Sequence, residues 1–188
     1  MRIITGRARG AQLYTLPGEA TRPTSERAKQ AIFSMIQFGI EGRYVLDLFA
    51  GSGQMALEAV SRGAAHATVC DSSKAACDVI EKNIRKIRAE SEVTLLCLDY
   101  AEALKRLRGR VKFDIVFLDP PYNKGLVSAA LKLLCRYDLL KSTSVVVCES
   151  GGEDILAGGV QDKYEVIKTA KYGIANVTLV KPICITNQ

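Results

Sequence analysis

From residue 44 onward, the hydrophobic and polar positions of this chain follow two alternating patterns. Short apolar runs predict strands, whereas longer segments with apolar residues three and four positions apart predict amphipathic helices. We expect strands at residues 44–49, 66–71, 93–98, 113–118 and 144–149, and helices at 54–62, 73–88, 101–108 and 125–136. This alternation is typical of a doubly wound α/β fold whose sheet is mostly parallel.

The pattern is different at the two ends of the chain. Two extended segments, 164–168 and 175–180, are close enough in sequence to form an antiparallel hairpin, which brings the predicted sheet to seven strands. Before residue 44 we expect a short β-like arm, a loop around Pro17, and a helix that begins near Thr24 or Ser25. We therefore divide the chain into a basic arm and helix at 1–43 and a core at 44–188.

The segment Asp119-Pro120-Pro121-Tyr122 directly follows the apolar run 113–118. Open α/β sheets bind ligands at the carboxyl ends of their strands. The two prolines fix φ and have no N–H, so their carbonyls are rigid acceptors beside a carboxylate and an aromatic ring. Such a site suits a planar base with an exocyclic amino group, which the acceptors hold while the ring stacks on the base. The alternative is a strand followed by a simple Pro-Pro turn.

A second candidate site begins at Gly51-Ser52-Gly53, after the first predicted strand. The glycines permit a tight turn and a close approach of backbone to ligand, and the start of the following helix favours a negative group. The segment also fits the dinucleotide-binding fingerprint, with Asp71 placed to hold ribose hydroxyls. Asp47 discriminates between cofactors, because it would repel a pyrophosphate but can pair with the α-ammonium group of a methionine moiety. A nucleoside with an amino-acid tail therefore fits better than a dinucleotide.

Together, Asp47-x-Phe49-x-Gly51-x-Gly53 and the Asp-Pro-Pro-Tyr segment resemble the class I S-adenosylmethionine-dependent methyltransferases that methylate amino groups. The amino end narrows the resemblance to the RsmD family, whose members methylate the N2 amino group of a guanine in bacterial 16S ribosomal RNA. The segments that carry this second resemblance are Arg2-Ile3-Ile4-Thr5-Gly6, Arg9-Gly10, Thr21-Arg22-Pro23-Thr24, Arg27, Ala31-Ile32-Phe33 and Tyr172-Gly173.

The resemblance implies a role for each matching residue. The amine site would consist of Asp119, Pro120, Pro121 and Tyr122, and the S-adenosylmethionine site of Asp47, Phe49, Ala50, Gly51, Gly53, Asp71, Ser72, Asp99 and Tyr100. Asp99 would hold the adenine amino group, although it also fits an ordinary helix cap. The implied reaction is direct in-line methyl transfer to a flipped-out guanine, which is guanine 966 in the family. Since the sulfonium-bound methyl is already electrophilic, the protein needs chiefly to align the reactants and exclude water.

Charge is consistent with a nucleic-acid substrate. The net charge is +6, and residues 1–43 hold seven basic residues against three acidic ones. A basic arm suits phosphate contacts that position RNA without reading its sequence, and the alternative is a solvated surface. The candidate RNA contacts are Arg2, Arg7, Arg9, Arg22, Arg27 and Lys29.

The remaining composition limits the chemistry. The six cysteines form no C-x-x-C pair, so we expect buried free thiols and neither a metal site nor disulfides. His66 is the only histidine, which leaves little material for a Ser-His-Asp or Cys-His mechanism, and we place it at a strand edge. Because no secretory signal or membrane-length apolar stretch is present, we expect a cytoplasmic protein. We also expect a monomer, and the family resemblance implies that its partner is 16S ribosomal RNA in an assembling small subunit.

Three other functions fit part of the sequence. A DNA adenine-N6 or cytosine-N4 methyltransferase could use the same Asp-Pro-Pro-Tyr, but its target-recognition region is usually larger than the roughly forty residues that precede the core. A nicotinamide-dependent oxidoreductase explains the glycine turn and Asp71 but not Asp47 or Asp119. A noncatalytic RNA-binding protein explains the basic arm alone.

Overall fold

The computed structural model describes residues 1–16, 26–36 and 39–183. The predicted helix start near Thr24 or Ser25 lies outside these residues, as does Arg22. The chain forms two compact units, Met1–Tyr100 and Ala101–Gln188. These units differ from the division at residue 43 that we predicted from sequence. The basic arm is part of the first unit.

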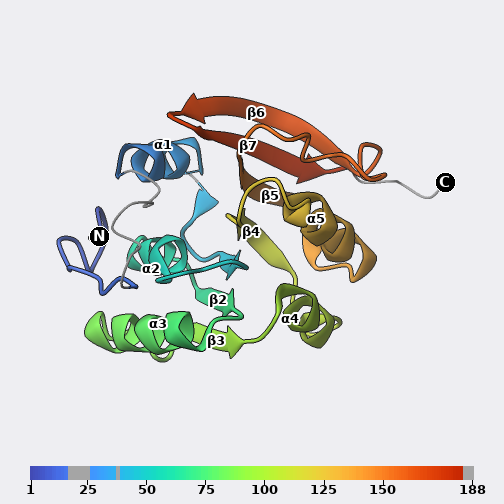
Figure 1. Ribbon diagram of the computed structural model, residues 1–188. Coiled ribbons are helices and arrows are strands. Elements are labelled where there is room, and N and C mark those ends of the chain that lie inside the picture. Colours follow the sequence, from blue (N-terminus) through green and yellow to red (C-terminus); the bar gives the residue numbers. More distant parts are fainter. Residues whose placement is uncertain (17–25, 37–38, 184–188) are drawn as a thin grey trace. The chain divides into compact units, whose positions relative to one another are not determined.

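Seven strands form one mixed sheet in the order β3-β2-β1-β4-β5-β7-β6, as predicted for a doubly wound fold with an antiparallel edge (Figure 1). The strands are β1 (Tyr44–Asp47), β2 (His66–Asp71), β3 (Val93–Cys97), β4 (Phe113–Leu118), β5 (Leu140–Ser150), β6 (Tyr164–Tyr172) and β7 (Ala175–Pro182). The helices are α1 (Glu26–Ile36), α2 (Gln54–Ser61), α3 (Lys74–Lys86), α4 (Tyr100–Leu107) and α5 (Leu126–Arg136).

In the first unit, β1, β2 and β3 are parallel, so their carboxyl ends lie at one edge. The helices α2 and α3 pack on these strands through buried side chains such as Leu57 and Ile80. His66 is the first residue of β2, and its Nε2 lies 2.9 Å from the hydroxyl of Thr94. The amino-terminal arm, blue in Figure 1, runs beside α2 and is closed by an antiparallel bridge between Arg2 and Gln12.

In the second unit, β4 pairs in parallel with β5, and β5 pairs antiparallel with β7. All six residues of β4 are buried, which explains its continuous apolar pattern. The predicted hairpin is confirmed, since β6 and β7 are antiparallel and are joined through Gly173 at φ 64°. The helix α5 packs on β5.

The strand β5 begins at Leu140, four residues before the predicted start, because a serine side chain bridges two strands there. The hydroxyl of Ser144 accepts a hydrogen bond from the Lys141 N–H at 2.7 Å and donates one to the Phe113 carbonyl at 2.6 Å. These bonds satisfy backbone groups where the register between β4 and β5 shifts. Polar residues can thus extend a strand beyond its apolar pattern.

The structure corrects the prediction that all cysteines are free thiols. Cys77 on α3 and Cys97 at the end of β3 form a disulfide, with Cα atoms 5.9 Å apart. Because α3 packs on β3, residues twenty positions apart become neighbours, and no local spacing reveals this. Cys70 and Cys148 are buried free thiols, as predicted, whereas Cys135 is free and exposed.

None of the described helices is long and apolar enough to cross a membrane.

Candidate cofactor and amine sites

The predicted glycine turn lies between β1 and α2. Gly51 and Gly53 have φ values of 57° and 77°, in the left-handed region where glycine carries no steric penalty. The turn is closed by a 2.7 Å hydrogen bond from the Gly53 N–H to the Ala50 carbonyl. The Ala50 N–H donates in turn to the Cys70 carbonyl at 3.0 Å, which fixes the turn against β2.

Asp71, at the end of β2, holds the glycine turn with its carboxylate. One oxygen accepts from the Gly51 N–H and the other from the Ser73 N–H, both at 2.8 Å. Ser72, which lies between Asp71 and Ser73 in the chain, is exposed. Because each carboxylate oxygen has two lone pairs, both remain able to accept a further hydrogen bond from a ligand hydroxyl. Asp71 therefore has a structural role that the sequence did not reveal.

Asp47, at the end of β1, is a buried carboxyl group that accepts a hydrogen bond from the backbone. It is 3% exposed, and its Oδ2 accepts from the Ala56 N–H of α2 at 3.2 Å. Burial, together with the negative charge of Asp71 and against the effect of the Ala56 bond, raises the pKa of Asp47 to about 7. Within the described part of the chain, neither carboxylate has an ion pair with a cationic side chain. A bound cation would therefore stabilise the ionised form of Asp47.

A third carboxylate, that of Asp99, lies near the same edge. Burial and the negative charges of Asp71, Asp47 and Asp99 together raise the pKa of Cys70 to about 12, against the effect of the thiol's bond to the Leu98 carbonyl. These three acids stand at or just after the carboxyl ends of β2, β1 and β3. Asp99 is exposed and directly precedes α4, the position in which the sequence left open both a ligand contact and a helix cap.

Two aromatic rings lie close to these acids in sequence and in space. The rings of Phe49, after β1, and Tyr100, at the start of α4, have centroids 5.4 Å apart and are tilted by 39°. Both side chains are partly exposed. The first unit thus presents an apolar pair of rings together with three carboxylates, an arrangement suited to a cationic ligand that has an aromatic part.

The Asp-Pro-Pro-Tyr segment lies at the carboxyl end of β4 in the second unit. Asp119 is exposed, Pro120 is buried and Tyr122 is half-buried. The hydroxyl of Tyr122 donates to the carboxylate of Glu149 at 2.6 Å, and its ring lies against Gly151, where a Cβ atom would come within 3.1 Å of it. The glycine therefore makes room for the tyrosine.

Glu149 and Glu153 were not among the predicted site residues, yet they fix the loop that follows β4. The carboxylate of Glu153 accepts from the Asn123 N–H at 3.2 Å and from the Gly151 N–H at 2.8 Å. Glu149, at the end of β5, is only 8% exposed. The signal available in the sequence was an acidic residue at the end of an otherwise apolar strand, where a buried charge needs a partner.

The predicted RNA contacts differ in their surroundings. Arg9 is exposed, and its side chain makes no ion pair with the residues that the structure describes. Arg7 forms an ion pair with Glu92, so its charge is already partly compensated. Arg2 is exposed. Arg22 and the side chain of Arg27 lie outside the described residues.

Lys29 is a correction, because its position is incompatible with a surface contact to RNA. Its side chain is fully buried, with the ammonium 3.2 Å from the carboxylate of Glu58 and 2.6 Å from the carbonyl of Arg2. The same carboxylate accepts from the Ile4 and Thr5 N–H groups at 2.8 and 3.0 Å. Lys29 and Glu58 therefore attach the arm to α1 and α2.

Comparison with known proteins identifies the family. The model of the family described as "Conserved hypothetical protein 95" matches residues 1–181. YlbH of Bacillus subtilis is 34% identical over 184 residues, which cover 96% of this chain and 98% of the relative. Ribosomal RNA small subunit methyltransferase D of Haemophilus influenzae is 32% identical over 183 residues, covering 95% and 92%.

Solved structures agree with this assignment. The Escherichia coli protein yhhF superposes with a TM-score of 0.84 at 26% identity, over 97% of each chain. HI0767 of Haemophilus influenzae gives a TM-score of 0.82 at 28% identity, over 97% of this chain and 98% of the other. A more distant likeness in fold, to SMU.776 in complex with SAH, has a TM-score of 0.65 at 17% identity, over 85% of this chain and 50% of the other. The chain therefore belongs to the RsmD and YlbH family and is a methyltransferase with the class I fold.

Proposed function

We propose that this protein transfers a methyl group from S-adenosylmethionine to the exocyclic N2 amino group of a guanine in 16S ribosomal RNA. The observation that carries the proposal is the Asp-Pro-Pro-Tyr segment at the carboxyl end of β4, whose tyrosine and following loop are fixed by Glu149 and Glu153. A fixed row of acceptors beside an aromatic ring suits an amine on a planar base.

The carboxylates of the first unit support S-adenosylmethionine as the cofactor. This molecule carries a cationic sulfonium, which makes its methyl group electrophilic, and an α-ammonium group that suits the buried carboxylate of Asp47. A dinucleotide is disfavoured because its pyrophosphate would face Asp47, Asp71 and Asp99. In this assignment the residues that hold the cofactor are Asp47, Phe49, Ala50, Gly51, Gly53, Asp71, Ser72, Asp99 and Tyr100.

Each part of that set has a distinct task. Asp71 accepts hydrogen bonds from the ribose hydroxyls with the lone pairs left by Gly51 and Ser73. Asp99 accepts from the adenine amino group, and the rings of Phe49 and Tyr100 provide apolar surface for the base. The left-handed Gly51 keeps the backbone free of a side chain where the ligand approaches. Gly53 instead faces the interior, where a Cβ atom would lie 3.4 Å from the side chain of Ile80.

On the amine side, Asp119 and the Pro120 carbonyl accept the two N–H bonds of the guanine amine. These bonds orient the nitrogen lone pair toward the methyl group, and alignment of this kind lowers the barrier without a covalent intermediate. The ring of Tyr122 stacks on the flipped-out base, and its bond to Glu149 fixes the orientation of that ring.

The names of relatives support ribosomal RNA as the substrate. The Haemophilus influenzae protein and an Escherichia coli relative, 32% identical over 155 residues that cover 82% of this chain and 76% of that protein, are both named ribosomal RNA small subunit methyltransferase D. The proposal extends this substrate to the present chain, in the cytoplasm and on an assembling small subunit.

The decisive experiment maps methylated nucleotides in 16S ribosomal RNA from cells with and without this gene. Loss of a single N2-methylguanosine on deletion, its return with the wild-type gene and its absence with an Asp119→Asn gene are the expected results. Transfer of labelled methyl groups by the purified protein to adenine N6 or cytosine N4 in DNA, with ribosomal RNA unchanged, would contradict the proposal.

A further inference from the structure

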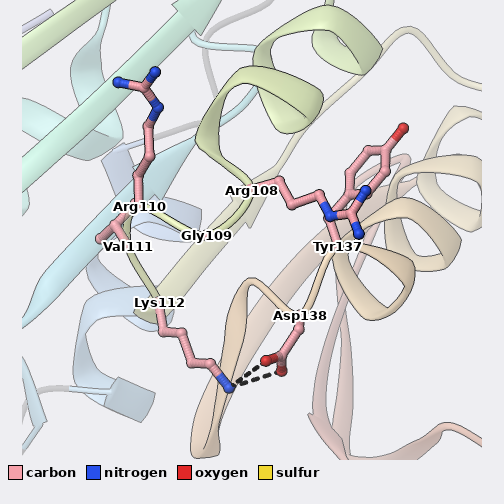
Figure 2. Close-up of a pocket in the computed structure, with 7 residues that line it drawn as sticks. All are labelled: Arg108, Gly109, Arg110, Val111, Lys112, Tyr137 and Asp138. Atoms are coloured by element: carbon pink, nitrogen blue, oxygen red, sulfur yellow. Dashed lines mark hydrogen bonds and ion pairs between the residues drawn. The ribbon is translucent and has the colours of Figure 1, made fainter.

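A pocket of about 460 Å³, drawn in Figure 2, lies in the second unit. Its lining precedes β4 and β5 in sequence, so it is at the opposite end of β4 from the Asp-Pro-Pro-Tyr segment. One wall is the chain that leads into β4 and the other is the chain that leads into β5. The pocket is lined by Arg108, Gly109, Arg110, Val111, Lys112, Tyr137 and Asp138. It is therefore separate from the amine site.

The lining of the pocket carries a net positive charge. Three of the lining residues, Arg108, Arg110 and Lys112, are basic, and one, Asp138, is acidic. The charge of Lys112 is compensated by Asp138, whose carboxylate lies 2.7 Å from the ammonium (Figure 2). This ion pair joins the two walls of the pocket. Arg108 and Arg110 are exposed, and their side chains make no ion pair or hydrogen bond with the described part of the chain. Two guanidinium groups are thus left to interact with a ligand. Figure 2 shows that Arg108 extends toward Tyr137 and Arg110 away from it, so the two would contact different phosphates of one strand.

We propose that this pocket binds the phosphodiester backbone of the RNA substrate, with an unpaired base against Tyr137. This inference rests on the proposed function, since it names a second contact region for the same substrate. The planar fork of each arginine matches a phosphate with two parallel hydrogen bonds. The half-buried ring of Tyr137, at the end of α5, offers a face on which any base can stack.

The distance between the two sites implies a recognition role and no role in the chemistry. The six residues of β4 separate them, a span of about 20 Å at the rise of an extended strand. One nucleotide cannot contact both sites, so the pocket holds a part of the RNA distant from the methylated base. Loss of the pocket should weaken RNA binding without changing methyl transfer once RNA is saturating.

The test compares the wild-type protein with the double variant Arg108→Gln/Arg110→Gln, using a 16S ribosomal RNA fragment that contains the methylated guanine. RNA affinity is measured by fluorescence anisotropy between 50 and 200 mM salt, the range in which phosphate contacts are most visible. The slope of log K against log salt should fall in magnitude by about 1.8 for two lost contacts to duplex RNA, or about 1.4 for single-stranded RNA. The KM for RNA should rise severalfold, with kcat and S-adenosylmethionine affinity unchanged.

The matched control is Lys168→Gln/Lys171→Gln, which removes the same charge from two exposed positions on β6 of the same unit. If this control lowers the slope as much as the arginine variant does, only the net charge matters and the pocket is not a site. An unchanged slope in the arginine variant also overturns the inference, and selective binding of an acidic protein there would assign the pocket to a different partner. A failure of the proposed function can be told apart from a failure of this inference. In that case the wild-type protein would methylate no ribosomal RNA, whatever salt slopes the variants give.

Discussion

At the scale of single residues, Asp47 links the cofactor site to pH. Its pKa is raised to about 7 by burial and by Asp71, so half of the free protein carries a neutral Asp47 at that pH. Only the ionised form pairs with an ammonium group, so affinity for S-adenosylmethionine should rise between pH 5.5 and 7.5. Calorimetry across this range checks the expectation, and Asp47→Asn should give weak binding with a much flatter profile.

The same shift fixes the sign of the contribution of Asp47 to the stability of the free protein. Since its folded-state pKa lies above the ordinary aspartate value of 3.8, the folded state binds the proton more tightly than the unfolded state does. This contribution is present below pH 3.8 and is lost as the pH rises through about 7. Bound cofactor reverses the preference by stabilising the ionised form. A cofactor affinity that does not change with pH in the folded protein would show that Asp47 is not the ammonium partner.

Asp119 is the residue on which the proposed chemistry depends most. Asp119→Asn keeps the size of the side chain but replaces an acceptor oxygen by a donor amide that opposes the guanine amine. Single-turnover methyl transfer with saturating RNA should fall roughly a hundredfold or more, by analogy with the loss of one transition-state hydrogen bond. Because Asp119 is exposed, its replacement should leave stability and cofactor affinity nearly unchanged. Transfer at the wild-type rate would reduce the segment to a simple turn.

Tyr122 illustrates what the structure adds to a residue chosen from sequence. On sequence alone Tyr122→Phe should be harmless, because the stacking ring remains. The structure shows that the hydroxyl donates to Glu149, which is buried, so phenylalanine removes a hydrogen bond from a buried carboxylate. We expect a loss of about 1–3 kcal/mol in unfolding free energy and a measurable fall in single-turnover rate.

Denaturant unfolding and rapid-quench kinetics measure both effects. Tyr172→Phe is the matched control, because Tyr172 is also half-buried and its hydroxyl makes no hydrogen bond with the described residues. Equal stability and rate in the Tyr122→Phe and Tyr172→Phe proteins would show that Glu149 does not position the ring.

At the scale of elements, the arm depends on the buried carboxylate of Glu58. This carboxylate pairs with Lys29 and Arg62 and accepts two arm N–H groups. Glu58→Ala leaves a buried ammonium without its counter-ion, which typically costs about 3–5 kcal/mol. Denaturant unfolding should show this loss, and limited proteolysis should cut the arm sooner.

Glu81→Ala provides the control for Glu58. Glu81 pairs with Arg85 on the exposed face of α3, and exposed pairs contribute about 0–1 kcal/mol. If the two alanine variants unfold at the same denaturant concentration, the arm is not held by this ion pair.

The elements also show which kinds of structure the sequence could predict. The positions of β2, β4 and the final hairpin follow from apolar periodicity, because burial on a sheet imposes that pattern. The burial of Lys29 and the Cys77–Cys97 disulfide do not follow from it, since both depend on which helix packs on which neighbour. Asp71 and Asp47 were recognisable from their places at strand ends, but their bonds to Gly51 and Ala56 were not.

At the scale of the whole molecule, the sign of the net charge changes twice along the chain. Residues 1–43 and 101–188 each have a surplus of four basic residues, whereas residues 44–100 have two more acidic than basic residues. The surplus at residues 1–43 predicted an RNA-contacting arm, whereas the surplus at residues 101–188 has no comparable clustering at one end of the chain. The second becomes a site only in the fold, because the chain before β4 and the chain before β5 meet around Arg108 and Tyr137.

Because the salt slope counts the phosphates that are contacted, and the two basic regions share no partner in the described residues, their effects on this slope should add. Arg9→Gln should lower the magnitude of the salt slope by about 0.9, and its combination with Arg108→Gln/Arg110→Gln by about 2.7 on duplex RNA. Arg9 is a cleaner choice than Arg7, whose replacement also breaks the ion pair with Glu92. Anisotropy titrations of the single, double and triple variants at several salt concentrations provide the measurement. A triple variant whose slope equals that of the double variant would show that Arg9 lies on a solvated surface and that the RNA is held elsewhere.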